Sequence, residues 1–492
     1  MKNKLEQTRE FFIDPRRPET SEALAQLGAD TVRAMAQIYA TGGDIELMDA
    51  KTQRWLTKSK DADDLTELMG ELLYRESFTR KFDHKFMGQI HPQGGKIGIL
   101  ASLVAAYMNT NTIVKEVSSS EHSMELEAID WLGDMFGYDR EKMSGNIVTD
   151  GTMANIAALW VAREKKIKEM KENGRWNRNT TFHVLVNDMA HYSIDKACVL
   201  LGTENVVITR LPRIGFKTDV RAAEELVRII NETEGDEVMA LVGLAGETET
   251  AEVDDLDGLA DLAEKTGTYL HVDAAYGGPF IMSRQRGLFK GIERADSITV
   301  DPHKMLYAPY EAGAVLFKDR RNHALIQKNA RYLQPEENKG LLGNPADRNF
   351  GFAARVEGTL GSGGVIATWA TERLLGKDGF AAILDHTLDL TRHCYDKVEG
   401  SLLLRPLHVP ELNTLLIGLS DDLNLSDNEY SDLVRDVQKA VDQKYGYYVS
   451  CNDEVDHGKS AFRFVAMHPW TGIEEVEELI SCLEIEIALH LK

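Results

Sequence analysis

Residues 268–305 read TYLHVDAAYGGPFIMSRQRGLFKGIERADSITVDPHKM and contain two short apolar strands that each lead into polar groups. The first strand, TYLHV, ends at Asp273. The second, SITV, runs into Asp301 and is followed by His303 and Lys304. Open α/β sheets bind ligands at the carboxyl ends of their strands, so a carboxylate and an amine there can converge on one ligand. This stretch therefore predicts an α/β protein whose chemistry lies in the segments that follow its strands.

The same alternation of β-rich runs and helical periodicity extends from about residue 100 to residue 320. Further strands are predicted in HVLVND, NVVITRL, EVMALVGLAG and GAVLFKD, with helices over 152–170 and 254–266 between several of them. Alternation of this kind is typical of a largely parallel sheet. We therefore expect an α/β fold with a central, mostly parallel sheet.

Element patterns set the expected domain boundaries, because the chain has no internal repeat, no low-complexity segment and only 12 prolines. Residues 1–93 are predicted to form helices that pack on the core or on a partner chain. Residues 94–375 are predicted to form the large α/β domain. Residues 376–492 are predicted to form a small α+β domain whose last helix begins with a capping box, Thr471 to Glu474.

Composition excludes several classes of protein. The chain is 43% hydrophobic and 27% charged, and no run approaches the ~18 apolar residues of a membrane span. The net charge of −23, from 56 basic and 79 acidic residues, disfavours a nucleic-acid partner. No apolar stretch follows the first lysines, so no signal peptide is expected and the cytoplasm is the expected location. The four cysteines show neither a CxxC pair nor zinc spacing, so we expect free thiols and no metal site.

Lys304 and Asp273 form the pair that pyridoxal phosphate requires. Its Schiff base needs a lysine amine, and a carboxylate keeps its pyridine nitrogen protonated so that the ring accepts electrons. The small side chains of Ala274 and Ala275 would let a flat ring lie on the strand. Each residue alone has an ordinary alternative, because most lysines are solvated at the surface and many aspartates after strands stabilise turns.

Two further segments predict a phosphate cradle and a stacking imidazole. GNIVTDGTMAN, residues 145–155, supplies an apolar strand, a turn and then a helix, whose first backbone amides would bind phosphate. Asp150 in this turn is expected to point its carboxylate away from a phosphate dianion. His191 follows the strand HVLVND and can stack on a pyridine ring. The ordinary alternatives are an N-cap turn and a satisfied core histidine.

Together the motifs resemble the pyridoxal-phosphate-dependent group II amino-acid decarboxylases, which include glutamate, aromatic amino-acid, tyrosine and diaminobutyrate enzymes. The resemblance covers residues 80–470, in the family's motif order: NTNTIVKEVSSSEHSMELEAIDWL, GNIVTDGTMAN, HVDAAYGG, DPHKM and VEGTLGSGG. GNIVTDGTMAN looks especially like the phosphate segment of bacterial tyrosine decarboxylases. The resemblance implies a fold-type-I pyridoxal-phosphate-dependent transferase-like fold and an obligate homodimer with active sites at the interface.

The resemblance also assigns roles to individual residues. It implies that Lys304 carries the cofactor, Asp273 contacts the pyridine nitrogen, and Ala275 and His191 lie beneath and above the ring. The remaining cofactor contacts that it implies are Thr149, Gly151, Thr152, Thr248 and His303. Gln89 and His91, in KFMGQIHPQGG, are the implied substrate contacts.

Two segments depart from the family pattern. Many relatives carry a tyrosine in a mobile loop that protonates the substrate carbon, yet the corresponding residues 334–352 contain no tyrosine. Either another group gives the proton or the product differs. The loop is expected to act as a lid across the dimer interface. The second departure replaces a family Gly-Thr-Thr by Gly246-Glu247-Thr248, which removes a hydroxyl at position 247.

The expected activity is that of a carboxy-lyase of amino-acid metabolism, which converts an L-amino acid to its amine and carbon dioxide. The alternatives are another fold-type-I lyase that breaks a carbon-carbon bond, or an aldehyde-forming relative. A non-enzymatic nucleotide-binding protein is disfavoured because GxGxxG and GxxxxGK[ST] are absent. The substrate stays open: an acidic one would require a cation such as Arg331, Arg348 or Arg355.

Overall fold

The computed structural model describes residues 18–56, 65–80, 82–112, 118–202, 204–328 and 354–492. They divide into two compact units, Met1–Phe82 and Asp83–Lys492. In the first unit, the helices α2 (Pro18–Ala40), α3 (Ala50–Trp55) and α4 (Leu65–Ser77) contribute to a small apolar cluster that includes Ile38 and Leu73. None of the helices in these described ranges combines the length and the apolar composition needed to cross a membrane.

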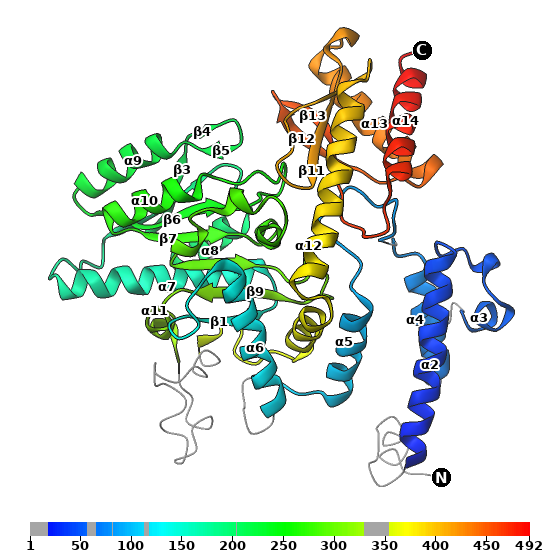
Figure 1. Cartoon of the computed structure of the whole chain (residues 1–492), viewed down its shortest axis with the longest axis horizontal. Helices are drawn as coiled ribbons and strands as arrows, with labels where there is room; N and C mark the ends of the chain where they lie inside the picture. The colour runs from blue at the N-terminus through cyan, green and yellow to red at the C-terminus, as the bar shows by residue number, and fades with distance from the viewer. Residues whose placement is uncertain (1–17, 57–64, 81, 113–117, 203, 329–353) are drawn as a thin grey trace. The chain divides into compact units, whose positions relative to one another are not determined.

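The second unit is built on a seven-stranded sheet (Figure 1) with the order β1-β9-β8-β7-β6-β2-β3. The strands are β1 (Ser144–Val148), β2 (Thr181–Asn187), β3 (Val206–Leu211), β6 (Asp236–Leu244), β7 (Tyr269–Asp273), β8 (Ser297–Val300) and β9 (Gly313–Phe317). β9 runs antiparallel to both of its neighbours, and all other neighbouring pairs are parallel. The predicted mostly parallel sheet is therefore confirmed.

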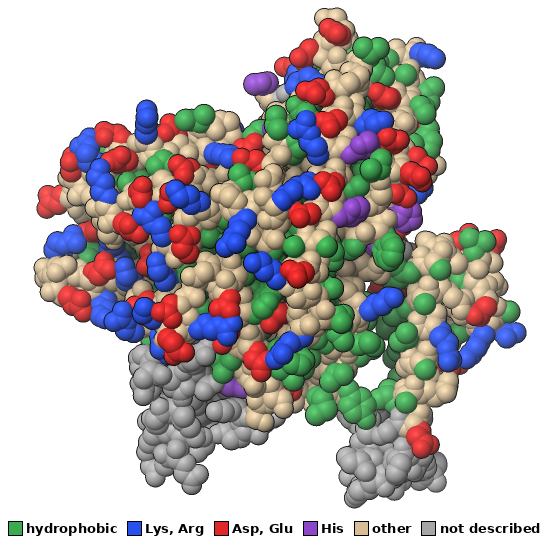
Figure 2. Space-filling view, in the orientation of Figure 1, with side chains coloured by type: hydrophobic (Ala, Val, Ile, Leu, Met, Phe, Trp, Pro, Cys, Tyr) green, Lys and Arg blue, Asp and Glu red, His purple; other side chains and the backbone are tan. Residues whose placement is uncertain are grey.

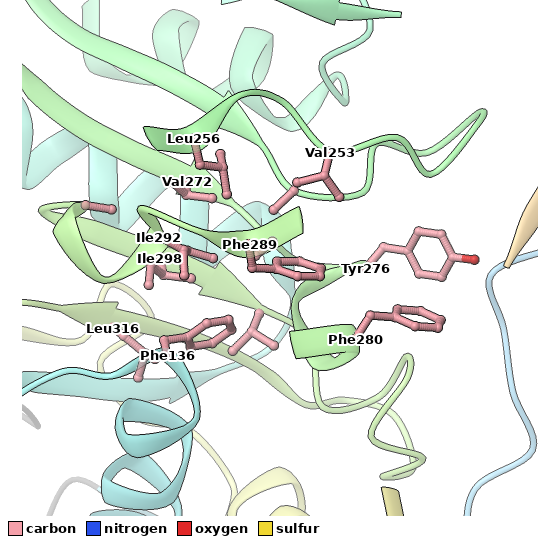
Figure 3. Packing of buried hydrophobic residues seen from close by; sticks show 14 of the residues in the cluster. Phe136, Val253, Leu256, Val272, Tyr276, Phe280, Phe289, Ile292, Ile298 and Leu316 are labelled. Atoms are coloured by element: carbon pink, nitrogen blue, oxygen red, sulfur yellow. The ribbon is translucent and has the colours of Figure 1, made fainter. Parts of the chain in front are cut away.

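Helices cover both faces of this sheet, which explains why its strands read as nearly continuous apolar runs. α6 (Ser119–Phe136), α9 (Val220–Glu232) and α10 (Leu256–Thr266) pack on one face, and α7 (Gly151–Glu172) and α8 (Ser193–Gly202) pack on the other. β6 serves both cores, because Leu241 belongs to the first cluster and Val242 to the second. Figure 3 shows the first cluster, in which Phe136 lies beside Leu316.

The chain ends in a smaller four-stranded antiparallel sheet. Its strands, in the order β10-β11-β13-β12, are β10 (Leu404–Pro406), β11 (Thr414–Leu419), β13 (Lys459–Val465) and β12 (Ser450–Asp456). It packs with α13 (Asp427–Tyr445), α14 (Ile473–His490) and part of α12 (Gly363–Glu399) around a separate apolar cluster. α12 is interrupted at Gly376, whose φ of 56° favours glycine. Gly376 is the first residue of the predicted small domain, and the two boundaries between the three predicted domains stay predictions.

The predicted start of the last helix is wrong by one residue. The hydroxyl of Thr471 donates to the carbonyl of His84 at 2.8 Å and so does not cap the helix. α14 instead begins at Ile473, and the carboxylate of Glu475 accepts a hydrogen bond from the backbone N–H of Gly472 at 2.8 Å.

Two phenol hydroxyls connect the large sheet to the small one. Tyr276, just after β7, donates to Asn413 Oδ1 at 2.5 Å and lies 3.0 Å from Thr414 Oγ1. Tyr307 donates to the carbonyl of Met467 at 2.8 Å. Both tyrosines are buried, so these hydrogen bonds are shielded from water.

Candidate active site

Five segments that follow strands meet in one cavity of about 210 Å³. They follow β1, β2, β6, β7 and β8. β1 has the same direction as β8 because β9 pairs antiparallel with both, so the carboxyl ends of all five strands share one edge. Of the residues expected to hold a cofactor, the lining contains Gly151, Thr152, His191, Thr248, Asp273, Ala275, His303 and Lys304.

Lys304 is paired with the carboxylate of Asp301. The Nζ of Lys304 is 2.9 Å from Asp301 Oδ2. Burial raises the pKa of Asp301 to about 6, although the charge of Lys304 opposes the rise. Burial alone would lower the pKa of Lys304, but the charges of Asp301 and Asp273 outweigh it and the pKa is raised. Asp301 Oδ1 is buried and has no hydrogen-bond partner in the described part of the chain, which leaves an acceptor at the cavity unsatisfied.

Asp273 is held in position by hydrogen bonds to both of its carboxylate oxygens. Its Oδ1 accepts from the backbone N–H of Ala275 at 3.1 Å, and its Oδ2 accepts from Asn155 Nδ2 at 2.9 Å. His191, which follows β2, lies with its Nδ1 2.9 Å from Ser193 Oγ. Burial lowers the pKa of His191, so the imidazole is neutral near pH 7.

The predicted phosphate segment forms the start of α7. The helix begins at Gly151, and Asp150 caps it by accepting from the backbone N–H of Met153 at 2.9 Å. A Cβ at Gly151 would lie 2.8 Å from Asp301 Oδ2, so glycine is required for this close approach. Thr149 lies elsewhere: its backbone N–H and hydroxyl donate to Glu357 Oε1 at 2.8 and 3.2 Å. Its expected phosphate contact therefore gains no support from this geometry.

His303 and one of the two implied substrate residues, His91, lie against Tyr310. The rings of His303 and Tyr310 stack with centroids 4.1 Å apart, and the ring of His91 lies 4.7 Å from that of Tyr310. Burial lowers the pKa of His303 to about 3, so this imidazole is neutral. Neither Gln89 nor His91 lines the cavity, and the amide of Gln89 lies 3.5 Å from the hydroxyl of Tyr448.

The departure at Glu247 places a buried carboxyl group in the cavity wall. Its oxygens accept from the backbone N–H groups of Glu249 and Thr250 at 2.6 and 2.5 Å. Burial raises its pKa to about 7 despite these hydrogen bonds. Thr248 lines the same cavity.

The remaining predicted features lie outside the cavity or outside the described residues. Arg355 is buried in an ion pair with Glu125 and does not line the cavity. Arg331, Arg348 and the loop of residues 334–352 fall outside the described residues.

Sequence reasoning missed three residues of this region. Asn155 lies one helical turn beyond Gly151, and this spacing of four residues could have placed it on the cavity side of α7. Nothing in the sequence around Tyr310 indicated a role for it beyond that of an aromatic residue in a loop. Arg463 could have been noticed as a cation inside the apolar strand AFRFVAM: it is only 7% exposed, and its Nε has no hydrogen-bond partner in the described ranges. Burial lowers its pKa, which the charges of Tyr276 and Glu247 oppose.

A family model described as the pyridoxal-dependent decarboxylase conserved domain matches residues 53–403. The chain belongs to this family. Family membership indicates pyridoxal phosphate as the cofactor and a carboxy-lyase as the class of enzyme. The recognition of a group II decarboxylase from the motifs is thereby confirmed.

Curated relatives act on several amino acids. An aromatic-L-amino-acid decarboxylase of Bacillus atrophaeus is 30% identical over 317 residues, which are 63% of this chain and 62% of the relative. An L-2,4-diaminobutyrate decarboxylase of Rhizobium meliloti is 33% identical over 276 residues, 56% of this chain and 52% of the relative. The match thus spans less than two thirds of the length of either protein. A probable L-tyrosine/L-aspartate decarboxylase of Methanosphaera stadtmanae is 30% identical over 373 residues, 74% and 82% of the two chains.

Solved decarboxylase structures share the fold. The glutamate decarboxylase domain of a diaminobutyrate-pyruvate transaminase and L-2,4-diaminobutyrate decarboxylase from Vibrio parahaemolyticus superposes with a TM-score of 0.81 at 21% identity, covering 99% of this chain and 100% of that one. An Oryza sativa TDC with PLP and tryptamine gives 0.82 at 17% identity, covering 98% and 100%. The predicted fold type is confirmed.

The residues of the cavity fit pyridoxal phosphate. A lysine and an aspartate reach it from neighbouring strands, and the backbone amides at the start of α7 open onto it. The unsatisfied Oδ1 of Asp301 supplies a further acceptor. The lysine amine therefore matches the aldehyde of the cofactor, the aspartate carboxylate matches its protonated ring nitrogen, and the backbone amides match its phosphate.

Proposed function

We propose that the chain decarboxylates an L-amino acid to the corresponding amine and carbon dioxide, using pyridoxal phosphate attached to Lys304. The observation that carries the proposal is the convergence of Lys304, Asp273 and the start of α7 on one cavity. When bound, the cofactor would supply an electron sink for the bond that breaks at the substrate's α-carbon.

The chain's own residues hold and tune this cofactor. The carboxylate of Asp273 would keep the ring nitrogen protonated, and the partial burial of the site strengthens that ion pair relative to water. Ala275 offers a small surface beneath a flat ring, and the neutral His191 can stack above it. The amides of Gly151 and Thr152 would bind the phosphate at the positive end of α7.

We further propose that Arg463 holds the carboxylate of the substrate. Its side chain is buried, and its Nε has no hydrogen-bond partner among the described residues. It does not itself line the cavity, but it interacts electrostatically with Tyr276 and Glu247, which do, and with Glu249. A buried cation is costly unless counter-charges reach it, and a substrate carboxylate would add one to those of Glu247 and Glu249.

A homodimer is the proposed assembly, and α5 (Lys96–Met108) supports it. This helix exposes Leu100, Leu103, Val104, Tyr107 and Met108, each more than half accessible. Figure 2 shows hydrophobic side chains gathering over this helix. A contiguous apolar face of this kind marks a protein interface, and we propose a second copy of the chain as its partner. A cytoplasmic location is also proposed, because the four cysteines are free thiols.

Labelling of the cofactor lysine tests the chemistry. Borohydride reduction of the holoenzyme followed by peptide mapping should place the pyridoxyl group on Lys304, because reduction makes the linkage permanent. Lys304→Ala should bind little covalent cofactor and lose several orders of magnitude in rate. A pyridoxyl group on any other lysine would refute the assignment.

A product analysis separates decarboxylation from its alternatives. The fold is shared with a Rhodiola rosea 4-hydroxyphenylacetaldehyde synthase, at a TM-score of 0.78 and 16% identity, and an aldehyde-forming reaction is the second candidate. Aromatic, diamino and acidic amino acids should be screened with amine, aldehyde and carbon dioxide measured under air and under nitrogen. Equal amounts of amine and carbon dioxide in both atmospheres are expected. Aldehyde formed only under air would favour the alternative.

A further inference from the structure

Asn155 uses every hydrogen-bonding position of its side-chain amide. It lies on α7, is 1% exposed and lines the cavity. Its Nδ2 donates to Asp273 Oδ2 at 2.9 Å and to Ser193 Oγ at 2.8 Å. Its Oδ1 accepts from Thr299 Oγ1 at 2.7 Å and lies 2.9 Å from His271 Nε2. An amide offers two donors and two acceptor sites, so the side chain is fully satisfied.

The charge of Asp273 determines the direction of these hydrogen bonds. An ionised carboxylate only accepts, so the atom of Asn155 that faces it must be the amide nitrogen. The amide oxygen therefore faces His271, and His271 Nε2 must carry a hydrogen. Burial lowers the pKa of His271 to about 4, which leaves this imidazole neutral. Its Nδ1 then accepts from the hydroxyl of Ser297 at 2.8 Å.

A second branch runs from Asn155 to His191. Ser193 Oγ receives a hydrogen from Asn155 and lies 2.9 Å from His191 Nδ1, to which its own hydroxyl hydrogen can be given. The backbone N–H of Ser193 also points to that nitrogen at 3.3 Å. His191 Nδ1 is thus an acceptor, and the neutral ring carries its hydrogen on Nε2.

We propose that Asn155 is a positioning residue that couples Asp273 to His191: it orients the carboxylate toward the ring nitrogen of the cofactor, and it fixes the tautomer of the imidazole. The inference rests on the proposed function, because it places pyridoxal phosphate in this cavity. Asparagine suits the position because aspartate would set an acceptor against Asp273, and alanine would leave Thr299 and His271 without an acceptor.

Cofactor binding by two matched probes tests the coupling without any measurement of turnover. The full-length apoprotein is titrated with pyridoxal phosphate and with its 1-deaza analogue, in which a C–H replaces the ring nitrogen. Asn155→Asp and Asn155→Ala should weaken binding of pyridoxal phosphate at least tenfold, about 1.4 kcal/mol, and change binding of the analogue less than twofold. Equal losses for both probes, or no loss for either, would overturn the proposal.

A matched control uses Asn146, which is also 1% exposed but lies on β1 outside the cavity lining. Asn146→Ala should keep the wild-type ratio of the affinity for pyridoxal phosphate to the affinity for the analogue. If this ratio falls as far as it does in the Asn155 variants, the proposal is overturned. Failure of the wild-type protein to bind pyridoxal phosphate would instead refute the proposed function.

The tautomer of His191 gives a second, independent readout. Nitrogen-15 spectra of histidine-labelled holoenzyme should show hydrogen on Nε2 of His191 in the wild type, with the signal assigned by its loss in His191→Gln. In Asn155→Ala, the hydroxyl of Ser193 loses its incoming hydrogen bond and can accept from His191, while the backbone N–H of Ser193 still points to Nδ1. The hydrogen on Nε2 is then favoured by the backbone N–H alone, and a mixture of tautomers is expected. An unchanged tautomer in that variant would overturn the coupling.

Discussion

Asp301→Asn should make the amine of Lys304 more reactive in the apoprotein. The substitution preserves shape and removes a negative charge 2.9 Å from Nζ. Coulomb's law with an effective dielectric constant of about 20 gives roughly 6 kcal/mol for unit charges at this separation. The side chain of Lys304 is 23% exposed, so water screens part of this energy, and Asp273 still favours the charged amine. We expect a net effect of about 1.4–3 kcal/mol, or ten- to a hundredfold in the fraction of free amine.

The assay is competitive labelling of the apoprotein with an amine-selective reagent at pH 8, with modification of the Lys304 peptide quantified by mass spectrometry. Asp301→Asn should raise the labelling rate by at least tenfold. Asp150→Asn is the matched control, because this residue also lines the cavity and asparagine preserves its role as a helix cap. An unchanged rate in Asp301→Asn, or an equal increase in Asp150→Asn, would refute the view that Asp301 holds the lysine charged.

Three further outcomes are expected. Asp273→Asn should retain cofactor but turn over roughly 10³-fold more slowly, about 4 kcal/mol of barrier, and near wild-type turnover would show that another group tunes the ring. Arg463→Gln should raise KM by about ten- to a hundredfold, because a hydrogen bond to a charged group contributes about 1.5–3 kcal/mol; a change confined to kcat would contradict its proposed contact. Burial raises the pKa of Glu372 from 4.5 to about 8. Between these pH values the folded chain keeps a proton that the unfolded chain releases, so the free energy of unfolding falls as the pH rises. Glu372→Gln should therefore raise the free energy of unfolding at pH 8.5 by about 1–2 kcal/mol in urea titrations, whereas Asp378→Asn, at an exposed site on the same helix, should not.

The sequence predicted the strands and the residues at their ends because both depend on local pattern. The run ending at Asp273 and the run ending before Asp301 are apolar and short, and a parallel sheet brings such ends to one edge. The hydrogen-bond partners of these residues could not be predicted in the same way. Asn155 is 118 positions away from Asp273 in the chain, and only the packing of α7 on the sheet brings them together.

The surroundings of single side chains, inside and outside the motifs, could not be predicted either. Thr149 is of a residue type that phosphate sites favour, yet in the structure its backbone N–H donates to the carboxylate of Glu357, more than 200 positions away in the chain. Arg463 lies in the small sheet, and its nearness to cavity residues depends on how that sheet meets the large one. Such relationships depend on tertiary contacts that no local pattern encodes.

The buried hydrogen bonds of Tyr276 and Tyr307 limit how this protein can open. Each connects a segment that follows a strand of the large sheet to a residue in or next to the small one, and separating the two would break these hydrogen bonds and expose the buried phenol rings to water. Because Tyr276 also lines the cavity, a swing of the small sheet would distort the wall on which a ligand rests. We therefore expect ligands to enter and leave with these two contacts intact, and amide hydrogen exchange in β11 should stay slow with and without cofactor.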